Sequence, residues 1–415
     1  MSLPRKHPIR RIVEPFASIK ITVTLMALAI VLIFFATWAQ KDIGIWEVQK
    51  HYFYTWITYF DFTTGGKVNP DTGIFEPAKT VFRLYMPGGY IVGGGLLISL
   101  TLAPIVHFKL AVRKLGIHFI HLGIVILLIG ELITGLRAKE SQMSIREGKT
   151  TNYAETVFPF VSELALINVT EPDHHRIYAI DQNKLEPGYQ FTCPDWPIRI
   201  EVVEFYENVQ VTGRNAAPEG FVPPAADSGI ANDIAFRAIP YNRKQDNKPP
   251  NRPAALIKIS DVSTPKEKTI GTWFCASGVD VPQRLSLGNR VFEIQLRPER
   301  TYFPFSVTLN DFQFNRYPGS EIPKDFSSYV TITEDDNREG RDVRIWMNHP
   351  FRTDGYTLFQ QSYAPDETGT VLQIVRNPVW TFPYIGCAVV TLGMLVQFGL
   401  SLYNHTEKLK RQANA

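Results

Sequence analysis

The sequence predicts a membrane protein with four transmembrane helices, three before and one after a large extracytoplasmic β-rich domain. Three observations lead to this fold class: the apolar runs, the distribution of basic residues, and a long segment of alternating polarity. The apolar runs lie at 19–39, 85–107, 115–136 and 379–403. Each approaches the roughly 20 residues that an α-helix needs to cross a bilayer core of about 30 Å.

The first apolar run is expected to remain attached as an anchor. It is longer than the apolar region of a secretory signal peptide, and Trp38 stands at the centre of a poor cleavage sequence. The basic arm before it leads into the apolar run within about 20 residues, which leaves no room for a plastid transit peptide. We therefore expect a multi-pass protein of the bacterial cytoplasmic (inner) membrane.

The basic residues predict the orientation of the chain. They concentrate in the N-terminal arm, in the connection between the second and third runs, and in the C-terminal tail: Arg5, Lys6, Arg10, Arg11, Lys109, Arg113, Lys114, Lys408, Lys410 and Arg411. Short basic segments stay on the cytoplasmic side of a membrane, so both termini are expected to be cytoplasmic. Because the excess of charge reports topology, nucleic-acid binding is disfavoured.

These two signals divide the chain into successive parts. We expect a cytoplasmic arm (1–18), three transmembrane helices with an outer loop at 41–84 (19–136), an extracytoplasmic β-rich domain (137–377), a fourth transmembrane helix (378–403) and a cytoplasmic tail (404–415). An aromatic run at 52–62 in the outer loop suits either the membrane interface or a packed loop.

The large outer segment has the pattern of β-strands. Runs that alternate or are β-branched are separated by Gly, Pro, Asn and Asp turns; they lie at 198–204, 255–259, 291–296, 306–309, 329–332, 343–347, 356–359 and 371–375. The stretch 216–253 is rich in Pro, Asn and Asp and is expected to form a long loop or a poorly ordered excursion.

Cysteine usage excludes two kinds of redox site. Cys193 and Cys275 fall in the outer domain, where they could form a disulfide or remain free, whereas Cys387 falls in the last apolar run. The chain has no Cys-x-x-Cys and no Cys-x-x-Cys-His. It therefore has neither a thioredoxin-type motif nor a covalent heme site of its own.

Two histidines in the third apolar run are the first candidates for chemistry. His118 and His121 are three residues apart, so on a helix they lie on one face. An imidazole in hydrocarbon is costly without a partner, which a heme or a metal would supply. The alternative is a packed histidine that hydrogen-bonds a neighbouring helix. His349, in Asn348-His349-Pro350, is a weaker candidate in the outer domain, because this tripeptide is more typical of a turn.

Several motifs late in the outer domain carry a resemblance to a known family. They are PFSVTLNDF (304–312), YPGS (317–320), PKDFSSY (323–329), IWMNHP (345–350), GYTLFQQSY (355–363) and RNP (376–378), preceded by REG (146–148). Their order, with three apolar runs before and one after, resembles the ResB (CcsB) family of the System II cytochrome c biogenesis machinery. The stretch 168–291 carries no motif of that family.

The resemblance implies a role in heme delivery. ResB-like proteins work with a ResC/CcsA-type membrane protein to export heme and present it for thioether ligation to apocytochrome c. By this resemblance His121 is the expected heme axial ligand, with His118 as the second choice and the heme bound transiently and shared with the partner. The chain would be an accessory subunit of a cytochrome c heme-lyase (synthetase) complex, with bond formation centred on the partner and thioredoxin-like thiol reductants as further partners.

Two other functions stay open from the sequence. The chain could be a non-catalytic scaffold that stabilises the ResC/CcsA-type partner. A b-type electron-transfer subunit would need two intramembrane histidine pairs on facing helices, and the apolar runs hold a single cluster.

Overall fold

The computed structural model divides the chain into two compact units. A helical unit comprises Met1–Ala138 and Asn377–Ala415, and a β unit comprises Lys139–Arg376. The predicted outer domain, 137–377, has nearly the same bounds. The structure describes residues 14–64, 67–68, 75–76, 80–106, 114–156, 161–171, 175–241, 251–263, 265–279, 281–320, 323–334 and 340–413.

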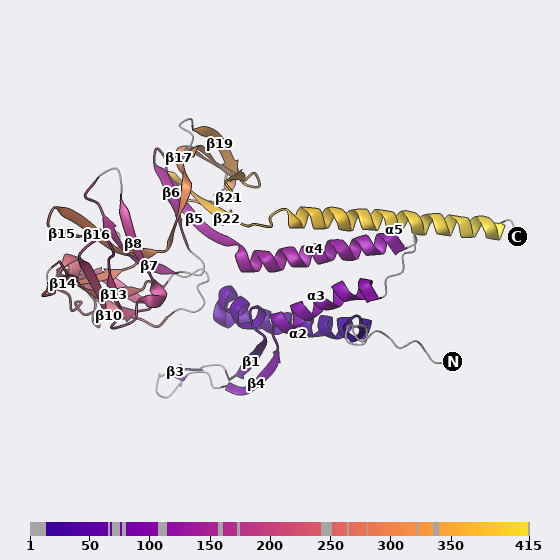
Figure 1. Cartoon of the computed structure of the whole chain (residues 1–415), viewed down its shortest axis with the longest axis horizontal. Helices are drawn as coiled ribbons and strands as arrows, with labels where there is room; N and C mark the ends of the chain where they lie inside the picture. Colours follow the sequence, from indigo (N-terminus) through magenta and orange to yellow (C-terminus); the bar gives the residue numbers. More distant parts are fainter. Residues whose placement is uncertain are drawn as a thin grey trace. The chain divides into compact units, whose positions relative to one another are not determined.

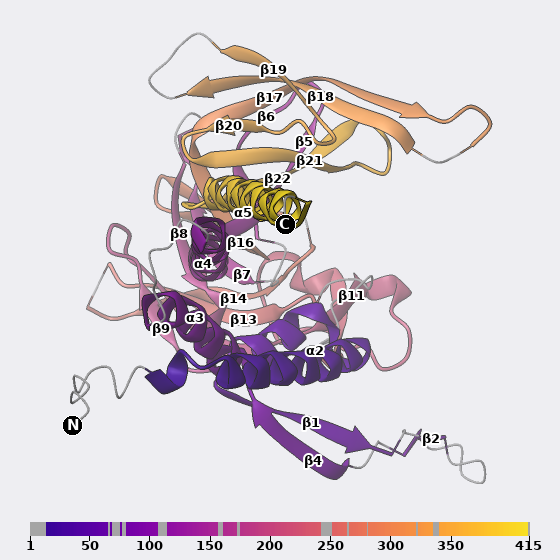
Figure 2. The same ribbon diagram turned by 90° about the vertical axis from the view of Figure 1, so that its right-hand side faces the viewer.

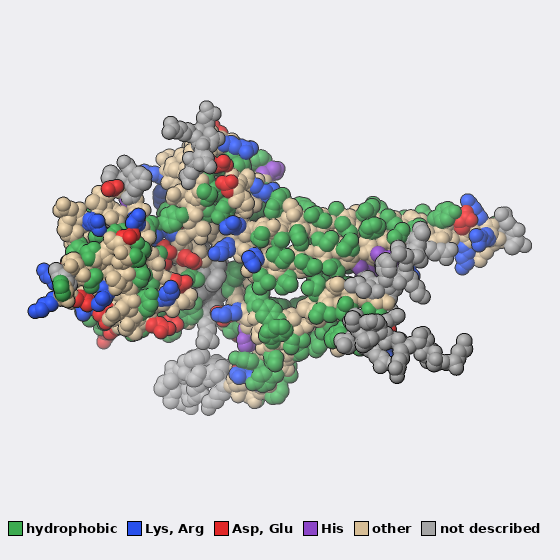
Figure 3. All heavy atoms as spheres, viewed as in Figure 1, with side chains coloured by type: hydrophobic (Ala, Val, Ile, Leu, Met, Phe, Trp, Pro, Cys, Tyr) green, Lys and Arg blue, Asp and Glu red, His purple; other side chains and the backbone are tan. Residues whose placement is uncertain are grey.

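The helical unit contains four long helices (Figure 1), namely α2 (Ile19–Val48), α3 (Gly89–Val106), α4 (Leu115–Arg137) and α5 (Phe382–Ala413). Three of them, α2, α4 and α5, are long and apolar enough to cross a membrane, whereas α3 is a shorter apolar helix. Hydrophobic side chains cover the visible surface along these helices (Figure 3). The β-rich domain and three potential spans are therefore confirmed, and the fourth span stays a prediction.

The segment between α2 and α3 is more ordered than a loop. Helix α2 continues to Val48 through a kink at Gly44, where φ is 77°, and a π-helical turn follows at Gln49–Phe53. Strands β1 (Ile57–Thr63) and β4 (Thr80–Pro87) then form a hairpin whose inner face packs Phe60 against Phe35 of α2. Two short strands, β2 (Lys67–Val68) and β3 (Phe75–Glu76), extend it. Helix α3 begins at Gly89 rather than at residue 85 because the preceding residues belong to β4.

Helices α4 and α5 lie side by side and make backbone contact (Figures 1 and 2). A Cβ atom placed on Gly123 would lie 2.8 Å from the carbonyl oxygen of Gly386, and one on Gly116 would lie 2.6 Å from that of Gly393. Side chains of any size would force the helices apart at these positions. Beyond this interface, the Asn377 amide donates to the Thr134 hydroxyl at 3.1 Å.

One lobe of the β unit is an eight-stranded sheet with the order β19-β18-β17-β6-β5-β22-β21-β20. Its strands are β5 (Lys139–Arg146), β6 (Thr150–Glu155), β17 (Arg300–Arg316), β18 (Pro323–Glu334), β19 (Arg341–Trp346), β20 (Phe351–Thr353), β21 (Tyr356–Tyr363) and β22 (Gly369–Arg376). Trp346 and His349 pair across the turn that joins the edge strands β19 and β20. The sheet therefore curls round on itself and encloses a core that includes Phe305 and Leu358.

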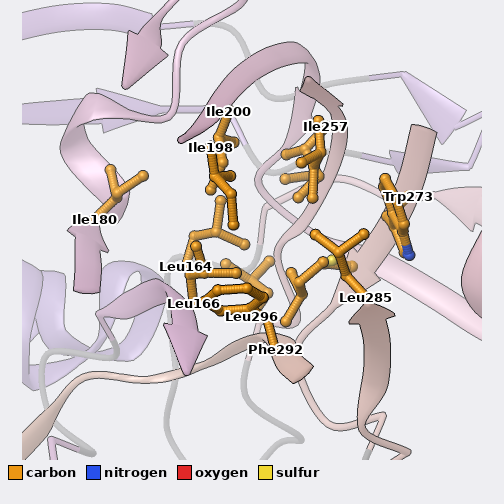
Figure 4. Packing of buried hydrophobic residues seen from close by; sticks show 14 of the residues in the cluster. Leu164, Leu166, Ile180, Ile198, Ile200, Ile257, Trp273, Leu285, Phe292 and Leu296 are labelled. Atoms are coloured by element: carbon orange, nitrogen blue, oxygen red, sulfur yellow. The ribbon is translucent and has the colours of Figure 1, made fainter. Parts of the chain in front are cut away.

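A second lobe packs two four-stranded sheets face to face. One has the order β15-β16-β7-β8 and the other β14-β13-β10-β9, with bounds β7 (Ser162–Asn168), β8 (Arg176–Asp181), β9 (Gln190–Thr192), β10 (Ile198–Tyr206), β13 (Ala254–Asp261), β14 (Lys268–Ala276), β15 (Gln283–Leu287) and β16 (Arg290–Pro298). Leu164, Ile257 and Phe292 meet in the core between them (Figure 4). A further pair, β11 (Val209–Gly213) and β12 (Ile234–Ala238), packs Val209 and Phe236 in a cluster with Leu256 of β13 and Phe274 of β14.

All eight strands expected from the sequence are present in the β unit. The expectation of one long loop at 216–253 was wrong in part, because β12 lies within it. Phe236 of this strand is buried against Phe274 of β14, so a tertiary contact orders a stretch whose composition favours turns. Residues 242–250 of that stretch lie outside the described part of the chain.

The cysteines of the β unit are free thiols in the second core. Cys193 and Cys275 are both buried there, and neither forms a disulfide. Burial raises the pKa of each thiol from 9.0 to about 12. Thiolate formation is therefore disfavoured in the folded protein.

We expect Gly123→Ala to destabilise the helical unit, because the added methyl group would meet Val390 and the Gly386 backbone within 2.8 Å. Overpacking of this kind typically costs about 1–3 kcal/mol. Thermal unfolding of the protein in detergent should show a lower midpoint. Gly399→Ala on α5 is the matched control, since a Cβ there has no neighbour within 4 Å. Equal midpoints for both variants would contradict the close packing.

We expect Cys193 and Cys275 to resist iodoacetamide at pH 8 in the native protein. With a pKa of about 12, roughly one thiol in 10,000 is ionised at that pH. Mass spectrometry should find both alkylated only after denaturation, without any reductant. Since the folded pKa is raised, unfolded thiols release their protons first and the free energy of unfolding should fall as the pH rises above about 9. Thiols that remain blocked after denaturation would indicate a disulfide instead.

Candidate functional site

The start of α4 borders a groove inside the helical unit. The groove has a volume of about 840 Å³ and receives side chains from the start of α2, from α3 and from α4. Both histidines singled out by the sequence line it, together with Glu14, Ala17, Ser18, Ile19, Thr22, Ser99, Leu100, Ala103, Lys114 and Ile117. The predicted pair therefore faces a common space large enough for a small-molecule ligand.

Helix geometry explains why the histidines face this groove. Gly116, Gly123 and Gly130 recur every seven residues, so they form one stripe along α4, and this stripe packs against α5. At about 100° per residue, His121 lies about 140° around the helix from Gly116. The glycine face and the histidine face therefore point in nearly opposite directions.

A hydrogen bond within α4 orients His121. Its Nδ1 lies 2.8 Å from the carbonyl oxygen of Ile117, one turn earlier. Because a carbonyl oxygen can only accept, Nδ1 carries the proton and Nε2 keeps its lone pair. Histidine ligands of metals commonly donate their other ring nitrogen to a carbonyl in this way. His121 is thus held in the tautomer that can ligate iron through Nε2.

The other walls of the groove combine apolar and polar groups. Ile19, Leu100 and Ile117 supply apolar surface, and the Thr22 and Ser99 hydroxyls share a hydrogen bond of 2.6 Å between α2 and α3. Lys114 adds a cationic side chain at the start of α4. This donor set fits an amphipathic ligand such as heme, which has an iron that takes an imidazole, an apolar macrocycle and anionic propionates.

His118 and His121 are both half-buried on the groove, so position alone does not rank them. The hydrogen bond from the ring Nδ1 of His121 to the Ile117 carbonyl is the feature that favours His121 as the ligand. Both assignments stay predictions. Among the described residues, no group of three or more His, Cys, Asp or Glu side chains could hold a metal ion.

His349 lies in the β unit and takes part in a turn. Its ring stacks on that of Trp346 at 4.1 Å, and its backbone N–H donates to the Trp346 carbonyl at 2.7 Å. Met347 between them has φ 28°, as a tight turn requires. His349 is exposed and lies in a turn, as the Asn-His-Pro sequence favours. A functional role for its imidazole stays a prediction.

Some residues behind the topology prediction lie outside the described part of the chain, namely Arg5, Lys6, Arg10, Arg11, Lys109 and Arg113. The described basic residues of the tail, Lys408, Lys410 and Arg411, are exposed on the last turns of α5.

Sequence reasoning missed the groups that build the groove around the histidines. The seven-residue recurrence of glycine in α4, matched by Gly386 and Gly393 in α5, is visible in the sequence and predicts a packed helix face. Thr22 and Ser99 carry no such signal, because they are 77 residues apart and meet only when α2 packs on α3.

Comparison with known proteins supports the family assignment. Residues 268–371 match the ResB-like family. The chain is also similar to protein NrfI of Wolinella succinogenes, with 24% identity over 302 residues, which is 72% of this chain and 29% of NrfI. It is similar to the cytochrome c biogenesis protein CcsB of a Picosynechococcus species, with 30% identity over 95 residues, or 23% of this chain and 20% of CcsB.

The chain thus covers less than a third of the length of each of these relatives. The family match runs from β14 into β22 and so includes the turn at His349 but not the groove of the helical unit. The resemblance that the motifs of the outer domain indicate is confirmed, since residues 268–371 of this chain are similar to the ResB-like family.

Proposed function

We propose that this protein acts in cytochrome c biogenesis by binding heme in the groove of the helical unit, with His121 as an axial ligand. The observation that carries the proposal is the hydrogen bond from His121 Nδ1 to Ile117, which leaves Nε2 as a lone-pair donor at the groove. The relative named as a cytochrome c biogenesis protein supports the process. Heme is here the cargo, held long enough to be passed on.

Heme iron has two axial positions, and His121 fills one of them. A ResC/CcsA-type membrane protein is the proposed source of the second ligand, of the bond-forming chemistry and of the contact with apocytochrome c. The chain's own residues bind and orient the cargo. His121 holds the iron, Ile19, Leu100 and Ile117 exclude water from the macrocycle, and Lys114 balances propionate charge.

The proposed topology gives this groove an entrance on the cytoplasmic side. All four long helices cross the membrane, both termini are cytoplasmic and the β unit is extracytoplasmic. Helix α3 has 18 residues, which at about 1.5 Å per residue spans roughly 27 Å, close to the thickness of a bilayer core. The exposed basic residues at the end of α5 support this orientation.

A non-catalytic scaffold is the alternative, and the outer surfaces of the helices favour it. Leu122, Leu128 and Leu132 of α4 and Leu395 and Phe398 of α5 are exposed in the isolated chain. Such surfaces would pack against lipid or against helices of the partner. The scaffold function needs these surfaces but not the imidazole of His121.

We expect His121→Gly to remove most of the heme from the protein purified together with its ResC/CcsA-type partner, and to lower cytochrome c maturation at least tenfold. The visible absorption spectrum measures the heme content of the complex. Heme staining of the matured cytochrome measures cytochrome c maturation. Imidazole added to the growth medium should restore both in part, because it can enter the space left by the side chain and supply a nitrogen ligand.

The matched control is His405→Gly, which removes an exposed histidine of α5 that does not line the groove. It should leave heme content and maturation unchanged. A His121→Gly complex that retains its full heme absorbance would exclude the ligand role and leave the scaffold as the better account.

The topology predicts opposite labelling of the β unit and of the C-terminal end of α5. Ser286 of β15 and Thr406 of α5 are both exposed, so each can be replaced by Cys in a Cys387→Ser background. In intact spheroplasts a membrane-impermeant maleimide should label Ser286→Cys fully, and Thr406→Cys only after lysis. The reverse pattern would invert the proposed orientation, and labelling of both sites before lysis would contradict a membrane crossing by α5.

A further inference from the structure

A pocket in the β unit gathers three arginine side chains from two separate segments of the chain. It has a volume of about 450 Å³, and Arg252, Arg297 and Arg300 line it with a single carboxylate, Glu155. Arg297 is the penultimate residue of β16, Arg300 begins β17, and Arg252 precedes β13. Convergence of guanidinium groups on one cavity favours an anionic ligand, because each presents several N–H donors in a planar fork.

Two of these arginines are fixed by ion pairs. Arg297 is only 6% exposed and lies 2.9 Å from Glu163, whereas Arg300 lies 2.9 Å from Glu155 and stacks over the Tyr153 ring at 4.0 Å. Such contacts hold the guanidinium planes in place at the pocket wall. Ligand binding would therefore cost little side-chain entropy here.

Arg252 differs from the other two. Its side chain is exposed and lies across Gly278, where a Cβ atom would come within 3.2 Å of its Nε. Among the residues that the structure describes, no carboxylate forms an ion pair with Arg252. The described charges at the pocket, three arginines and their two glutamate partners, thus leave one positive charge without a counterion.

The remaining walls of the pocket combine apolar side chains with the polar side chains of Ser277 and Gln295. Val279, Val281, Leu296 and Pro298 line it beside the arginines, and Val281 is 56% exposed. A small inorganic anion would use none of this surface. The complementary ligand carries a carboxylate on an apolar body, and the propionate edge of a porphyrin has this chemistry.

We propose that this pocket binds the carboxylate edge of a porphyrin, with Arg252 as the residue that supplies the uncompensated charge. The choice of porphyrin rests on the proposed function, since it gives the β unit a site for the same cargo that the helical unit binds. The carboxylate specificity rests on the pocket alone.

The test uses metal-free mesoporphyrin, which cannot be ligated by histidine through iron, and the full chain in lipid nanodiscs with His121→Ala. Fluorescence titration, corrected with empty nanodiscs, measures the dissociation constant. We expect Arg252→Glu to weaken binding about tenfold or more and Arg252→Lys to have an intermediate effect, because Lys keeps the charge but loses the planar fork. The mesoporphyrin dimethyl ester should bind weakly and equally to all variants.

Arg284→Glu is the matched control, since Arg284 is 70% exposed on the same unit and does not line the pocket. It should bind mesoporphyrin as the parent does. Thermal unfolding checks that the Arg252→Glu variant is folded. We expect it to fold because the Arg252 side chain is exposed. Equal affinity of parent and Arg252→Glu for mesoporphyrin, or equal affinity of the parent for acid and ester, would overturn the proposal.

The two proposals fail separately in these experiments. Heme retained by the partner complex after His121→Gly would disprove the groove ligand and leave the pocket result intact. Mesoporphyrin binding that is indifferent to Arg252 would disprove the pocket and leave the groove result intact.

Discussion

Backbone contact between α4 and α5 is the constraint on which the rest of the helical unit depends. In a bilayer, helices gain no hydrophobic free energy by associating, so close van der Waals packing has to hold them together. Gly116 and Gly123 of α4 meet Gly393 and Gly386 of α5, where even a methyl group would collide with a carbonyl oxygen. Because the glycine face of α4 packs against α5, a ligand can approach only the opposite face. That face carries His121.

The strand that follows α4 and the strand that precedes α5 are neighbours in the β unit. Strand β5 begins two residues after α4 ends, and it pairs with β22, which precedes α5. Arg376 lies opposite Lys139 in this ladder. The chain therefore enters and leaves the β unit through two adjacent strands, and any displacement of one of them would be transmitted to the other by the hydrogen bonds between them.

A polar crossing point joins the two lobes of the β unit. The Thr156 N–H donates to the Glu299 carbonyl and the Glu299 N–H to that of Val161, so the two connecting segments run side by side. Arg297 and Glu163 form a buried ion pair there, and burial raises the pKa of Glu163 although Arg297 opposes the shift. A buried ion pair is often no more stabilising than an apolar pair of similar volume.

Elements whose signal is local could be predicted from the sequence. Alternating polarity was sufficient for strands such as β10 and β13, and unbroken apolar length for α2, α4 and α5, because these patterns depend on neighbouring residues. The proximity of His118 and His121 also followed from helix spacing alone. Which distant residues meet depends on tertiary packing: Phe236 orders a turn-rich stretch by packing on Phe274, and Arg252 shares a pocket with Arg297 across 44 intervening positions. Such contacts depend on how whole sheets and helices pack, and no local pattern in a single sequence encodes them.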